Sequence, residues 1–221
     1  MLKQVISIFE KEVTLEWRNK TAFNGILLYL VSTIFICYLS FNLKRGQMQT
    51  DTWNALYWII IVFANINGVA KSFLQEGEGR MLYYYTLCKP QVILGGKLLF
   101  NILLSILIAV LGFSVYALIL GNPVANYAYF LLTILFASTG FSGVLTLVSG
   151  IVSKANNSTS LMAVLSFPIL LPILLMSVRL TKNAIDGIDI SLMNDKLFTL
   201  ISVDAIVITT AFILFPFIWR N

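Results

Sequence analysis

Few side chains in this sequence are suited to chemistry, and the missing ones restrict its function most. The 221 residues include no histidine, which removes the commonest general base and metal ligand. Cys37 and Cys88 lie too far apart for a zinc motif. Gly95-Gly96-Lys97 lacks the rest of a phosphate-binding loop. We therefore expect no enzyme, no metal site and no nucleotide bound by the chain itself.

Asp204 is the clearest candidate for a polar site inside the membrane. It lies about two turns into the last apolar run. A charge at mid-membrane costs about 3 kcal/mol on insertion scales, and less nearer the surface. The sequence leaves two interpretations open. Asp204 is either a functional intramembrane group or a carboxylate that reaches the interface or caps a helix.

Two prolines interrupt the fifth apolar run. Pro168 and Pro172 are four residues apart and share one helix face. Each removes a backbone donor and crowds the preceding turn, so we predict a kink or a hinge there.

The segment from 75 to 97 is the most distinctive polar part of the chain. Its acidic and basic side chains alternate with glycines that permit a sharp turn. Either it docks a partner, or it is an interfacial loop whose tyrosines lie at headgroup level. The residues concerned are Glu76, Glu78, Gly79 and Arg80.

Six segments are long and apolar enough to cross a membrane, which takes about 20 residues. Hydrophobic residues make up 58% of the sequence and charged residues 11%, against roughly 25% charged residues in a soluble domain. We predict an all-α, polytopic membrane protein with a single transmembrane domain over 1–221. The spans are expected near 23–41, 52–74, 98–120, 127–152, 160–178 and 197–219.

Residues 1–20 have the pattern of an amphipathic helix that lies in the membrane interface; packing on a soluble partner is the alternative. The apolar positions are Leu2, Val5, Ile6, Phe9, Val13 and Trp17.

In the fourth span, Ser138, Ser142, Thr146 and Ser149 share one face. We favour a helix-packing seam over a substrate-lining face, because small residues let helices approach closely in lipid.

The basic residues predict the orientation. Ten of the 15 Lys and Arg residues fall at the termini or in loops on their side, and five fall on the other side. The positive-inside rule places both termini in the cytoplasm. The net charge of +5 is spread over the ends of apolar runs, so we expect lipid and not nucleic acid around it.

Several features follow one another in a characteristic order: Glu16-Trp17-Arg18-Asn19-Lys20, then Phe73…Glu76…Gly79 leading to Leu87 and Lys97, then Gly140-Phe141 with small residues up to Ser149, then Lys154, and Phe-Pro-Ile-Leu-Leu-Pro-Ile-Leu-Leu at 167–175. Their order and spacing resemble the heme exporter protein B family, the permease subunit of the ABC complex for cytochrome c maturation. The resemblance covers essentially the whole chain.

The resemblance implies an ABC-2-type permease in the bacterial inner membrane. Its partners would be an ATPase subunit that binds ATP, a heme-handling membrane subunit and a heme chaperone, and a homodimer fits the need for two permease halves. Heme would be a substrate. The expected ATPase-docking residues are Phe73, Glu76, Glu78, Gly79, Arg80 and Lys97.

The leading function is heme export or release of the heme-loaded chaperone, driven by the partner's ATP hydrolysis. One alternative is an ABC-2 permease for a lipid, a polysaccharide or a drug. Another is a membrane scaffold that transports nothing.

Overall fold

The computed structural model describes residues 2–19, 21–42, 48–69, 73, 89–153, 158–188 and 190–220, and these ranges contain helices and no strand. The helices are α1 (Leu2–Asn19), α2 (Thr21–Asn42), α3 (Thr50–Val69), α5 (Pro90–Leu120), α6 (Tyr127–Val152), α7 (Ser158–Asp186) and α8 (Ile190–Arg220). All but α1 are long and apolar enough to span a membrane. The prediction of an all-α, six-span membrane protein is therefore confirmed.

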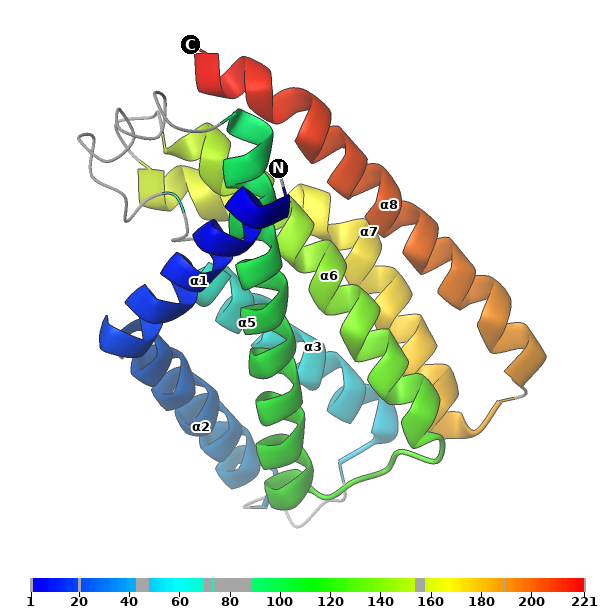
Figure 1. Ribbon diagram of the computed structural model, residues 1–221. Coiled ribbons are helices and arrows are strands. Elements are labelled where there is room, and N and C mark those ends of the chain that lie inside the picture. Colours follow the sequence, from blue (N-terminus) through cyan, green and yellow to red (C-terminus); the bar gives the residue numbers. More distant parts are fainter. Residues whose placement is uncertain are drawn as a thin grey trace.

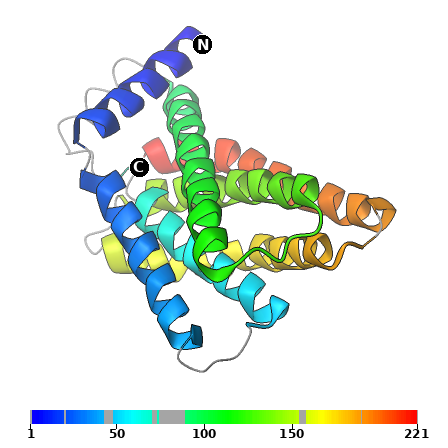
Figure 2. The same cartoon turned by 90° about the horizontal axis from the view of Figure 1, so that it is seen from below.

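The helix α6 lies at the centre of the bundle. It packs against α5, α7 and α8, and 72% of its span is buried inside the protein, against 17% for α8. In the view from below, α2 lies on one side of α5, while α6, α7 and α8 extend to the other side (Figure 2). The start of α1 and the end of α8 lie at the same end of the bundle (Figure 1).

The helix α1, whose sequence is amphipathic, packs against α5. It meets α2 at an elbow, and α5 crosses the open side of this V (Figure 1). A Cβ atom added to Gly96 would lie 2.6 Å from the side chain of Ile8, whereas one added to Gly95 would make ordinary contacts with Val5. Because Gly96 has no Cβ atom, α1 can pack directly on the first turns of α5.

Two helix ends extend eight residues beyond the predicted spans: the start of α5, and the end of α7 at Asp186, predicted at 178. The helix α5 begins at Pro90, although hydropathy alone places the span from 98. Proline suits the first turn of a helix because its missing N–H needs no partner there. Gly95, Gly96 and Lys97 lower the hydropathy of these turns, yet all three are buried.

The helix α7 is continuous through both prolines. Pro168 and Pro172 are exposed on its outer face, while Leu170 and Ile173 point into the core. The chain is therefore not broken there, and a kink or hinge stays a prediction.

Candidate functional site

Phe73 lies at a buried contact between three helices. Its backbone N–H donates a hydrogen bond to Ser149 Oγ on α6 (3.1 Å). Its ring centroid lies 5.3 Å from that of Phe215 on α8 and 4.7 Å from Lys97 Nζ on α5. Phe73 itself is fully buried. One residue thus joins α5, α6 and α8 immediately before the 74–88 segment.

Lys97 connects this contact to α1. Its side chain is 1% exposed and places Nζ 3.1 Å from Glu12 Oε1, and Lys11 Nζ lies 3.0 Å from the same oxygen. A buried ammonium is tolerated only when it is paired, and here a carboxylate and an aromatic face both contribute. We call Phe73 together with Glu12, Lys97, Ser149 and Phe215 the Phe73 junction.

The expected docking residues therefore fall into two groups. Phe73 and Lys97 lie together in the Phe73 junction, inside the protein. Glu76, Glu78, Gly79 and Arg80 lie outside the described residues. Lys97 points toward α1 and not toward a surface, so any contribution to docking acts through the position of α1 and α5.

A row of polar side chains continues from Lys97 into the bundle. On α5, Asn101 and Ser105 follow Lys97 at intervals of four residues, and all three are fully buried. Asn101 Nδ2 donates to Thr146 Oγ1 (2.7 Å), and Ser142 Oγ lies 3.0 Å from the Asn101 carbonyl oxygen. The hydroxyl face of α6 is thus a packing seam against α5, which confirms that interpretation.

The glycines of α6 form a different contact, with α8. A Cβ atom at Gly140 would overlap the carboxylate of Asp204, and one at Gly150 would lie 2.9 Å from the Phe215 ring. Gly143 faces Val207 in the same way. The small residues of α6 therefore serve two helices, with hydroxyls toward α5 and glycines toward α8.

Asp204 lies deep in this second contact. It is 4% exposed, and neither carboxyl oxygen has a hydrogen-bond partner among the residues that the structure describes. Ile173 of α7 lies beside Asp204, 3.0 Å from the position that a Cβ atom of Gly140 would take. Asp204 is thus buried among helices and caps none of the described ones, and its role as an intramembrane polar site stays a prediction.

A hydrogen-bonded network at the opposite end ties α3 to α7. Asn54 Nδ2 donates to the Val178 carbonyl (2.8 Å), and Thr181 Oγ1 donates to Asn54 Oδ1 (2.8 Å). Trp58 Nε1 donates to Thr181 Oγ1 (2.8 Å). The sequence does not predict this network, because a polar residue in an apolar helix does not reveal a hydrogen-bond partner more than 120 positions away.

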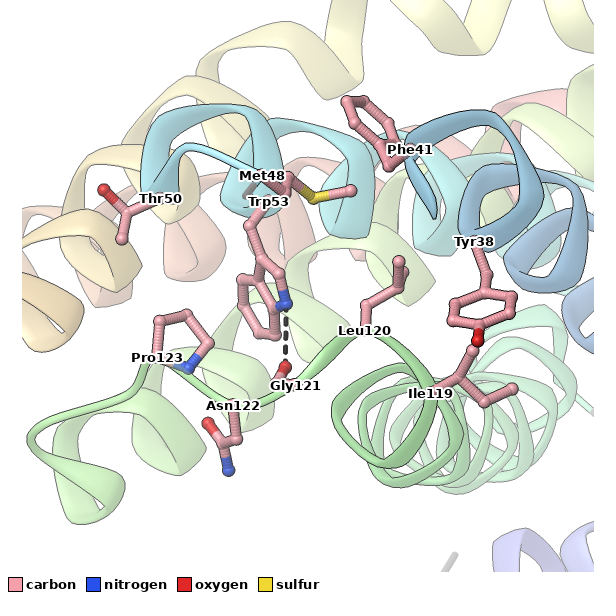
Figure 3. A pocket seen from close by; sticks show the side chains of 10 residues that line it. All are labelled: Tyr38, Phe41, Met48, Thr50, Trp53, Ile119, Leu120, Gly121, Asn122 and Pro123. Carbon is pink, nitrogen blue, oxygen red and sulfur yellow. Dashed lines mark hydrogen bonds between the residues drawn. The ribbon is translucent and has the colours of Figure 1, made fainter. Parts of the chain in front are cut away.

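Aromatic side chains surround this network. Trp53 Nε1 donates to the Gly121 carbonyl (3.0 Å), and the Tyr116 hydroxyl donates to the Trp53 carbonyl (2.9 Å). The indole of Trp53 lies beside a cavity of about 540 Å³ at the ends of α2, α3 and α5, which Tyr38 and Met48 also line (Figure 3). The two hydrogen bonds fix the start of α3 to the end of α5.

The described residues contain no group of three or more Cys, Asp and Glu side chains that could hold a metal ion. The model of the CcmB protein family matches residues 3–217, nearly the whole chain.

The chain belongs to the CcmB family. This is the family of heme exporter protein B, a membrane permease family of cytochrome c maturation, and the predicted resemblance is confirmed. A search of curated proteins gave no match.

Proposed function

We propose that this chain is the ABC-2-type membrane half of an ATP-driven complex, in which a separate subunit binds and hydrolyses ATP. The observation that carries the proposal is the Phe73 junction. Phe73 precedes the 74–88 segment, α5 follows it at Pro90, and Lys97 of α5 lies against the Phe73 ring. Both ends of the expected docking segment are thus attached to one buried contact.

Movement of that segment would reach four helices. Phe73 contacts Ser149 of α6 and Phe215 of α8, and Lys97 passes the displacement from α5 to Glu12 of α1. At the other end, the network of Asn54, Trp58 and Thr181 holds α3 against α7. We therefore expect ATP-driven motion at the junction end of the bundle and little at the network end.

The buried carboxyl of Asp204 and the prolines of α7 fit the same motion. Asp204 is held against Gly140 by packing alone in the described structure, so α8 can shift along the glycines of α6 without breaking a hydrogen bond of this side chain. We propose Asp204 as an intramembrane polar site that this shift uncovers, and Pro168 and Pro172 as the hinge of α7.

Heme is the proposed substrate of the complex, and its ligation is assigned to a partner. The chain has no histidine to bind the iron. ATP hydrolysis would then drive either heme export or release of the heme-loaded chaperone. Heme flux into reconstituted vesicles, with and without ATP, separates the two.

The proposed setting is the bacterial inner membrane with both termini in the cytoplasm, which the excess of basic residues on that side supports. An even number of spans returns the chain to the side on which it began, as the positions of α1 and the end of α8 suggest (Figure 1). Two copies of the chain would form the full permease.

The docking role is tested by charge reversal. Glu76→Lys or Glu78→Lys should reduce the amount of ATPase that co-purifies, while the yield of the permease stays unchanged. Asp195→Lys is the matched control, because Asp195 is an exposed acidic residue in the first turns of α8, at the opposite end. Normal co-purification of the ATPase with both Glu variants would count against docking through this segment.

A further inference from the structure

A cavity of about 410 Å³ is lined by residues of α1, α2 and α5, next to the elbow at which α1 meets α2. We call it the elbow groove. Its size is within the range of ligand-binding pockets, roughly 300–1,000 Å³. Three helices contribute to its walls, with Glu16 and Trp17 from α1, Asn24 from α2, and Phe100, Leu103 and Leu107 from α5.

The two ends of the elbow groove differ in polarity. Glu16 and Asn24 lie at the elbow itself, where the Glu16 carboxylate accepts a hydrogen bond from the Phe23 backbone N–H (3.1 Å). The wall formed by α5 is apolar, and Leu103 and Leu107 are 45% and 38% exposed. A ligand that matches this gradient has a polar head and an apolar tail.

The position of the elbow relative to the membrane agrees with such a ligand. Trp17 is 76% exposed in the last turn of α1, and tryptophans gather at headgroup level in membrane proteins. The charged side chain that lines the groove at this level is Glu16, so the elbow offers a carboxylate to a cationic headgroup. Leu2 and Ile6 continue the exposed apolar edge of α1.

We propose that the elbow groove binds one phospholipid of the adjacent leaflet. Its polar headgroup lies at the elbow beside Asn24, with the ammonium of an ethanolamine headgroup toward the Glu16 carboxylate, and one acyl chain runs along Leu103 and Leu107. The lipid fills the space between α1 and α5 that the Phe73 junction leaves open, and it holds the elbow at a fixed angle. Lipid binding at this site requires neither ATP nor a partner subunit. It can therefore be tested independently of the proposed transport function.

The test uses the full chain, reconstituted in vesicles of phosphatidylethanolamine and phosphatidylglycerol in equal parts. The protein is then extracted in mild detergent, and native mass spectrometry measures retained phospholipid. We expect one phospholipid mass per wild-type chain. Leu103→Trp fills the groove and should remove it, and Leu107→Trp is the second variant if the first does not insert.

Leu99→Trp is the matched control. Leu99 lies one turn earlier on α5, is 48% exposed and does not line the groove, so this variant should keep the lipid. Glu16→Gln should weaken retention of phosphatidylethanolamine by removing the carboxylate that faces its ammonium. Equal retention in wild type and both groove-filling variants would overturn the proposal. So would a protein segment, from a second copy or a partner, that cross-links to Leu103 while no phospholipid is retained.

Discussion

The substitution Glu12→Gln should loosen α1 from α5, because it removes a carboxylate from the buried ammonium of Lys97. Removing one partner of a buried ion pair costs about 3–5 kcal/mol. The Phe73 ring faces Lys97 Nζ at 4.7 Å before and after the substitution, so this contact does not reduce the cost. The free energy that holds α1 in place should therefore fall by about 3–5 kcal/mol.

Hydrogen exchange measures this loss directly, because amide protection reports the free energy of local opening. A decrease of that size corresponds to exchange of the α1 amides that is roughly 150- to 5,000-fold faster. The protein would be compared in the same lipid–detergent mixture as wild type. Glu10→Gln is the control, because Glu10 is exposed on the other side of α1 and its loss should leave protection unchanged.

A double variant separates charge burial from general damage to the helix. Glu12→Gln with Lys97→Met removes both charges and leaves no buried ion, so much of the protection should return. Two results would refute the reasoning: unchanged protection of α1 in Glu12→Gln, or a double variant that opens as readily as the single one.

Other substitutions test the remaining contacts. Gly96→Ala should displace α1 and speed its exchange, because the new methyl meets α1 at 2.6 Å, whereas Gly95→Ala should not; equal effects would contradict the close approach. Thr181→Val should destabilise the bundle by about 1–3 kcal/mol by leaving buried polar groups of α3 unpaired, seen as a lower midpoint of thermal unfolding. Thr199→Val, at an exposed site bonded within its own helix, should change little, and a similar shift in both would argue against the network. Asp204→Asn keeps the side chain's shape, so unfolding should stay near wild type while cytochrome c maturation falls; full maturation would exclude a role for the carboxylate.

The spanning helices are predictable because each is a long apolar run, and hydrocarbon requires such a run whatever the neighbouring helices are. The first and fourth spans, Phe23–Phe41 and Tyr127–Val152, have the predicted limits. The start of α5 was missed for a physical reason. Its glycines and Lys97 are buried beneath α1, and hydropathy scores a residue without reference to the helix that covers it.

The Phe73 junction was only partly predictable. The sequence indicates that Phe73 and Lys97 flank a polar segment, but it does not indicate that they touch. Glu12 is 85 positions from Lys97 and occurs among other charges of α1, so nothing in the sequence selects it as the partner. Asp204 was found as an anomaly in an apolar run, while its contact with Gly140 depends on helix packing.

The central claim is that ATP hydrolysis by a partner acts on the membrane helices through the Phe73 junction. The most direct measurement is hydrogen exchange of the complete complex with ATP and with a nonhydrolysable analogue. The account predicts a nucleotide-dependent change in α1 and the first turns of α5, and no change at Asn54, Trp58 and Thr181. A change confined to the network, or none at α1 while ATP is hydrolysed, would contradict it.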